Sequence, residues 1–182
     1  MNPLLRAFFI SFIVNFATSA SGLAAVSNLL NDKQIWKDEN EESHALTDWS
    51  QGPVVMTMIY GDCKKTCPYL TFVKLREIQK VLDAKKISAQ FIIGTFDPVN
   101  DTPSVLRHLK DVNATGRKNW HFIRGTSEQT HLLAQELGLG DYYEMDDHIV
   151  HKFRIVYFDP NSKHETAMDY QHKDVKSLNL AP

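Results

Sequence analysis

The stretch VVMTMIYGDCKKTCP, residues 54–68, decides the fold of this chain. Its first seven residues, 54–60, form an apolar run of the kind found in strands that are buried on both faces. The segment GDCKKTC breaks this run, and Pro68 suits the first turn of a helix. The stretch therefore predicts a strand, a loop with two cysteines and then a helix.

Strands and helices alternate along the chain after this unit. The predicted elements are a second buried strand at 90–95, a helix starting at Thr102 and Pro103, a short strand at 120–123, a helix that opens with a Thr126/Gln129 capping box and stops at Gly138, and a strand at 149–158. The alternation predicts an α/β fold with a mixed or parallel sheet. The cysteine loop then lies at the carboxyl end of a strand, where sites tend to form. Residues 31–50 are polar, and we expect a surface lead-in, with a hairpin as one possibility.

Length and composition limit the class of protein. The chain has 182 residues, of which 43% are hydrophobic and 23% charged, as in a folded single domain. It has only two cysteines, Cys63 and Cys67, too few for a disulfide scaffold. The formal net charge is −2 and no basic block is present, which argues against nucleic acid as a partner.

Residues 1–25 differ from the rest of the chain. Arg6 precedes an apolar run at 7–17, and small residues cluster at 18–25. This is the pattern of a secretory signal peptide, and the run is shorter than the ~20 residues of a membrane-spanning helix. We expect cleavage near Ala20 or Ala25, with an uncleaved anchor as the alternative. Residues 26–182 then form one domain in the periplasm or another extracytoplasmic place, membrane-associated only if the segment is uncleaved.

The spacing of Cys63 and Cys67 permits three kinds of chemistry. Four residues apart, the two side chains share one face of a helical turn, where they can close a disulfide or chelate a soft ion. A helix N-terminus lowers thiol pKa values, and Lys64 and Lys65 add positive charge. A structural disulfide, a dithiol redox catalyst and a metal site remain open. Nothing marks the dedicated thiol of a peroxidase.

Histidines are the candidates for further ligands. Six of the eight lie in polar stretches or lack a partner at chelating spacing: His44, His108, His121, His131, His164 and His172. His148 and His151 remain, and an odd separation along a strand points them to opposite faces, which disfavours a zinc site that uses both. Two thiolates and one imidazole suit Cu(I), and pattern alone does not choose between His148 and His151.

Several stretches, in order, resemble the Sco/SenC family of copper proteins. Residues 54–68 are similar to the family's strand leading into Cys-x-x-x-Cys-Pro, and residues 96–103 to its Asp-Pro-x-x-Asp-Thr-Pro segment. Residues 120–125 resemble its short strand ending in glycine. Residues 151–160 resemble the segment that begins with its ligand histidine, and this register selects His151.

The resemblance implies a thioredoxin-like fold, with a central mixed sheet flanked by helices. It implies that Cys63, Cys67 and His151 bind one copper ion, Cu(I) or Cu(II), and that the protein is a metallochaperone. The expected recipient is the cytochrome c oxidase subunit with the dinuclear copper centre, or another copper acceptor. Because the cysteines must be reduced to bind copper, a thiol reductant is an expected partner.

Two further expectations come with the resemblance. Some members of the family act mainly as thiol-disulfide reductases, so the alternative function is reduction of a partner protein by a Cys63–Cys67 redox pair, which forms a disulfide in its oxidised state. Asp97 and Asp101 match acidic positions of the family, and we expect them to cap the following helix and shape a turn.

Overall fold

The computed structural model describes residues 23–31, 33–63, 67–145, 148–169, 174, 175 and 180, without the side chains of 23–25 and 67. Most of the predicted signal peptide lies outside these residues. The elements, in chain order, are α1 (Leu23–Asn31), β1 (Ile35–Asp38), β2 (Ser43–Ala45), the 3-10 helix η1 (Leu46–Asp48), β3 (Val54–Ile59), α2 (Cys67–Ala84), β4 (Gln90–Thr95), α3 (Pro103–Asn113), β5 (Trp120–Arg124), α4 (Ser127–Glu136), β6 (Tyr143–Met145), β7 (His148–Val150), β8 (Ile155–Asp159) and β9 (His164–Met168).

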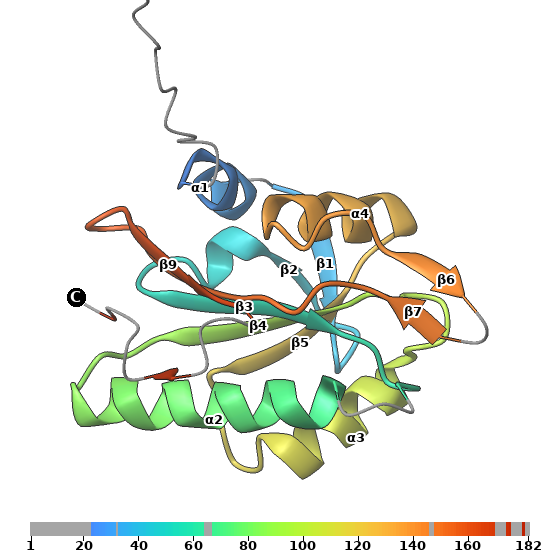
Figure 1. Ribbon diagram of the computed structural model, residues 1–182, viewed down its shortest axis with the longest axis horizontal. Helices are drawn as coiled ribbons and strands as arrows, with labels where there is room; N and C mark the ends of the chain where they lie inside the picture. The colour runs from blue at the N-terminus through green and yellow to red at the C-terminus, as the bar shows by residue number, and fades with distance from the viewer. Residues whose placement is uncertain are drawn as a thin grey trace, which may run out of the picture.

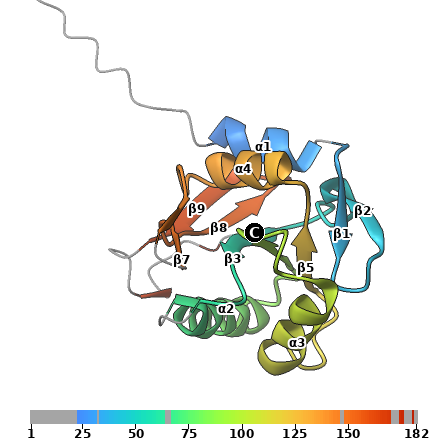
Figure 2. The same cartoon turned by 90° about the vertical axis from the view of Figure 1, so that its right-hand side faces the viewer.

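A mixed sheet forms the centre of the molecule, which confirms the predicted fold class. Its seven strands run in the order β2-β1-β5-β4-β3-β8-β9, and a separate hairpin pairs β6 with β7. Strands β3, β4 and β5 are parallel, whereas β1 and β8 join antiparallel to β5 and β3. Helices α1 and α4 cover one face of the sheet, and α2 and α3 cover the other (Figures 1 and 2).

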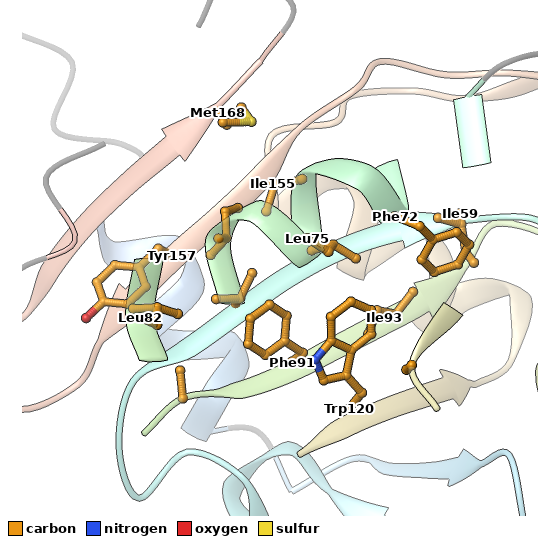
Figure 3. Close-up of a cluster of buried hydrophobic side chains, with 14 of the residues drawn as sticks. Ile59, Phe72, Leu75, Leu82, Phe91, Ile93, Trp120, Ile155, Tyr157 and Met168 are labelled. Atoms are coloured by element: carbon orange, nitrogen blue, oxygen red, sulfur yellow. The ribbon is translucent and has the colours of Figure 1, made fainter. Parts of the chain in front are cut away.

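Each face of the sheet has its own apolar core. All six residues of β3 are buried, as the apolar run predicts, and alternate residues of the strand serve the two cores. Figure 3 shows the core under α2, where the rings of Phe91 and Trp120 stack with centroids 4.9 Å apart and Leu75 lies nearby. Because both faces of β3 are buried, the strand is held in place within the sheet, and this fixes the position of the cysteine loop that follows it.

The predicted helix signals are present as hydrogen-bonded caps. The Thr102 hydroxyl accepts from the Val105 amide at the start of α3. At α4, Thr126 and Gln129 bond each other reciprocally. Gly138, with a φ of 68°, follows the last turn of α4 in the left-handed conformation that glycine tolerates.

Two local predictions are wrong. Residues 31–50 are more than a surface lead-in: β1 and β2 do form a hairpin, but it joins the main sheet, and Trp36 and Leu46 are buried in the core. The strand predicted at 149–158 is two strands, because β7 pairs with β6 in the separate hairpin and only β8 joins the main sheet. His148 and His151 therefore do not alternate along one strand.

Helix α1 crosses the predicted boundary between residues 25 and 26. Val26, Leu29 and Leu30 are buried in the core that α4 also covers. Within the described part of the chain, no helix combines the length and apolar character needed to cross a membrane.

Candidate metal centre

The cysteine loop leaves the sheet at the carboxyl end of β3. Cys63 is partly buried and packs against the core on the α1–α4 side. The backbone of Cys67 begins α2, as the sequence indicates, but its side chain and residues 64–66 lie outside the described part of the chain. A cysteine in the first turn of a helix experiences the positive end of the helix dipole, which favours the thiolate form.

A buried carboxylate anchors the start of this loop. Asp101, only 3% exposed, accepts hydrogen bonds from the Gly61 amide (2.9 and 3.1 Å to its two oxygens) and from the Thr95 hydroxyl. Burial raises the pKa of Asp101, and the bonds from Thr95 and Gly61 oppose that shift. A Cβ at Gly61 would lie 2.6 Å from both Asp101 Oδ1 and Val105 Cγ1, so only glycine fits this approach.

The expectation that Asp97 and Asp101 cap the next helix and shape a turn is half wrong. Asp97 shapes the predicted turn, because its Oδ1 accepts from the Asn100 amide at 3.0 Å. Asp101 instead reaches across to the cysteine loop, and Thr102 caps α3. Sequence spacing could not reveal the bond to Gly61, which joins residues 40 positions apart.

His151 lies in the irregular segment between β7 and β8. Its Nδ1 donates to the Lys152 carbonyl oxygen at 2.8 Å, which leaves Nε2 as the ring atom able to bind a metal. The Phe96 ring lies against the imidazole at 4.3 Å between centroids, and Tyr60 meets it edge-on at 5.8 Å. Burial lowers the pKa of His151, an effect that the bond to Lys152 opposes. These contacts fix both the ring plane and its tautomer.

Cys63 and His151 line the same small pocket. Met58, Tyr60, Pro68 and Thr71 are among the residues that complete it. His148 instead lines a larger groove, to which Tyr60 also contributes. The structure thus brings together two of the three predicted ligand residues and separates His148 from them. The role of all three residues as ligands stays a prediction.

The other described histidines have different surroundings. His121 stacks on Trp49 (4.4 Å) and bonds Gln90, and burial lowers its pKa to about 4. His131 bonds the Tyr142 hydroxyl. The sequence analysis missed one grouping: His44 with Asp38 and Glu42, whose ligand-type atoms lie within 4.8 Å of one another. Asp38 is also bonded there to the Asn40 and Glu42 amides, so the hairpin turn itself accounts for its position.

The chain is similar in sequence to a known protein family. The family model described as SCO1/SenC matches residues 36–179. The "SCO1 protein homolog" of Bacillus subtilis is 26% identical over 111 residues, which are 58% of this chain. The match spans 55% of that curated relative's length.

Solved structures share the fold. Yeast Sco1 with copper bound superposes with a TM-score of 0.61 at 17% identity, covering 81% of this chain and 88% of that one. BsSco, described as a member of the Sco family of cytochrome c oxidase assembly proteins, superposes with a TM-score of 0.63 at 20% identity, covering 75% and 80%. The predicted thioredoxin-like architecture is confirmed by this likeness.

Proposed function

Because the chain belongs to the SCO1/SenC family, we propose that it binds copper as cargo and passes it on during assembly of cytochrome c oxidase. Cys63, Cys67 and His151 are the proposed ligands. Relatives support each part: yeast Sco1 has been solved with copper bound, and BsSco belongs to a family of cytochrome c oxidase assembly proteins.

The observation that carries this proposal is the pocket shared by Cys63 and His151. These residues are 88 positions apart in sequence, yet the end of β3 and the entry to β8 bring them together. The backbone bond to Nδ1 leaves the His151 Nε2 lone pair available without a proton having to leave. Soft thiolates with one imidazole match the preference of Cu(I).

Delivery needs ligands that can be exchanged one at a time. Two thiolates, a neutral imidazole and Cu(I) carry a net charge of −1, and the two residues that follow Cys63 in the sequence, Lys64 and Lys65, are positively charged. A partner thiolate, thioether or imidazole replaces the protein ligands stepwise, so that the ion is never released to water. Oxidation of Cys63 and Cys67 to a disulfide removes both thiolates, so loading needs a thiol reductant in the extracytoplasmic compartment that the N-terminal sequence indicates.

The test compares the two neighbouring histidines. Reduced His151→Ala should bind Cu(I) at least ~10-fold more weakly than the wild type in competition with a chromophoric chelator, because a ligand is lost. It should also shift the thiolate-to-copper absorption bands of the Cu(II) form, because the coordination of the ion changes while both thiolates remain. His148→Ala is the matched control and should behave like the wild type. Equal copper affinity of His151→Ala and the wild type would refute the ligand assignment.

A second candidate function is reduction of disulfides in a partner protein. The observation favouring it is the placement of Cys67 at the first residue of α2, where the helix dipole activates thiols. This function needs Cys63 and Cys67 but no histidine. It predicts copper-independent turnover in a disulfide-reduction assay that survives His151→Ala and disappears in Cys63→Ser.

A further inference from the structure

A groove of about 630 Å³ lies beside the proposed copper pocket, and nothing in the proposed function uses it. Its lining includes residues of the β6–β7 hairpin and of the turn after β4; Figure 1 shows where the hairpin lies in the fold. Tyr60 lines both the groove and the Cys63–His151 pocket, so the two are adjoining spaces. Whatever occupies the groove therefore lies next to the proposed copper site.

The charges of the groove have one sign. Asp62, Asp97 and Glu144 line it, and no lysine or arginine is among the described residues that do. Burial and the Asp97 carboxylate raise the pKa of Tyr142 at the same wall, and Asp62 and Asp97 both act to raise the pKa of Asp101. The Asp97 carboxylate therefore acts on the Tyr142 side chain in the wall of the groove. Such a surface attracts a cation.

Aromatic rings supply the remaining walls. Tyr142 is held between Phe96 (centroids 5.1 Å apart) and His131, whose Nδ1 lies 3.1 Å from the Tyr142 hydroxyl. A ring fixed in this way, beside carboxylates, is the surface on which guanidinium and ammonium groups bind through cation–π contacts and ion pairs.

The rim of the groove is apolar and exposed. Val99 and Tyr143, on its two sides, are 76% and 57% exposed, and Met145, at the end of β6, is 46% exposed. Exposed apolar side chains around a polar pocket are typical of protein–protein contact surfaces. A small free amine would leave this rim uncovered, whereas a protein segment would cover it.

We propose that this groove is the docking site for the protein that exchanges copper with this chain, and that it holds a lysine or arginine side chain of that protein. The inference rests on the proposed function for the identity of the partner. The basic side chain lies between the carboxylates and the Tyr142 ring, and the apolar rim contacts its neighbours. Because Tyr60 separates this anchor from His151, docking places the partner's own ligands beside the copper.

The probe is a capped octapeptide of alternating glycine and arginine, titrated into the full chain and followed by backbone amide shifts. The largest shifts should fall on Val99, Asn100, Tyr143 and their neighbours. A capped glycine–glutamate octapeptide should not bind. Glu144→Lys should weaken binding of the arginine peptide about 5-fold or more, as should added salt, since the attraction is electrostatic. The control Asp111→Lys makes the same charge change at the far end of α3 and should change the affinity less than 2-fold.

Tyr143→Ser provides a second variant, because this exposed ring can be removed without a core being disturbed. It should weaken the peptide without a change in the unfolding midpoint. Three results would overturn the inference: shifts spread over the surface, equal loss in Asp111→Lys and Glu144→Lys, or binding of arginine amide as tight as that of the peptide, which indicates a small-cation site. Copper stoichiometry is measured on the same samples. Failure of the wild-type protein to bind copper would refute the proposed function, whereas the peptide results test only the docking role of the groove.

Discussion

Glu39 and Asp101 are two carboxylates buried to the same degree, 3% exposed each, at opposite places in the fold. Each accepts a backbone N–H from a distant segment: Glu39 from Phe122 at 3.1 Å, and Asp101 from Gly61 at 2.9 Å. Their other partners differ. Glu39 pairs with the Lys110 ammonium, whereas Asp101 takes the neutral Thr95 hydroxyl.

The difference distinguishes two places in the fold. Near β1 and β5 the buried carboxylate of Glu39 has a structural role, whereas after β3 and β4 the carboxylate of Asp101 holds the loop of the candidate site. Strand β1 pairs with β5 through Lys37 and Asp38 only, and the Glu39 carboxylate then continues the ladder at Phe122 while Lys110 of α3 compensates its charge. At the other edge, no described cation forms an ion pair with Asp101, and its negative neighbours Asp62 and Asp97 raise its pKa further. An ion pair joins elements of the scaffold, whereas the described contacts through which Asp101 holds the start of the Cys63 loop are hydrogen bonds.

The largest expected effect comes from breaking the scaffold pair. Glu39→Ala should lower the free energy of unfolding by about 3–5 kcal/mol, because Lys110 and the Phe122 amide lose their partner together. Glu39→Gln should recover little, since the ion pair is still absent. Glu41→Ala is the matched control: its pair with Arg124 is half exposed and should contribute less than about 1 kcal/mol. Urea unfolding measures all three, and similar losses at positions 39 and 41 would contradict the comparison.

Acid should weaken the Glu39 edge through His121. Its pKa is lowered to about 4, first by burial and then by the Lys110 charge. Between pH 6.5 and 4 the unfolded chain binds a proton that the folded chain does not, so stability falls as the pH falls, by about 3 kcal/mol in all. His121→Phe keeps a ring on Trp49 and should remove this slope. His108→Gln, at an exposed position, should keep the slope, and a pH profile unchanged by His121→Phe would refute the assignment.

The smallest expected effect is at Asp101, where the conservative variant should rescue. Asp101→Ala should cost about 1–3 kcal/mol, because the Gly61 amide loses its acceptor. Asp101→Asn should cost less than about 1 kcal/mol, since an amide oxygen still accepts from Gly61 and no cation loses a partner.

The pH dependence at Asp101 has the opposite sign to that at His121. The pKa of Asp101 in the folded protein is raised above 3.8. The contribution of this group to the stability of the protein therefore decreases as the pH rises above that value. Asp101→Asn should abolish this component of the urea-unfolding profile. Asp97→Asn should reduce this component without abolishing it, because the Asp97 charge is one of several causes that raise the pKa of Asp101 and asparagine also supports the turn at Asn100. Asp101→Asn as damaging as Asp101→Ala would show that the charge itself is required.

The sequence correctly predicted features that are determined by residues close together in the chain. The buried strand β3, the cap at Thr102 and the capping box at Thr126 depend on residues close in sequence, and the structure confirms them. The choice of His151 came from a family register, and the structure places it beside Cys63.

The features that could not be predicted from the sequence depend on contacts between segments that are distant in the chain. Glu39 resembles one member of an acidic surface run in the sequence, and its bonds to Phe122 and Lys110, 83 and 71 positions away, explain its burial. Trp36 likewise looks isolated until β1 joins β5. The groove needs the β6–β7 hairpin and the turn after β4 together, so no single stretch could predict it.

Helix α1 has a practical consequence for producing the protein. Val26, Leu29 and Leu30 contribute to the core that α4 covers, so an expressed fragment that starts after Asn31 would leave an apolar patch open to water. Such a fragment should aggregate even though every proposed copper ligand is present. Recombinant protein should therefore begin at or before Leu23, and an affinity tag should precede α1 rather than replace it.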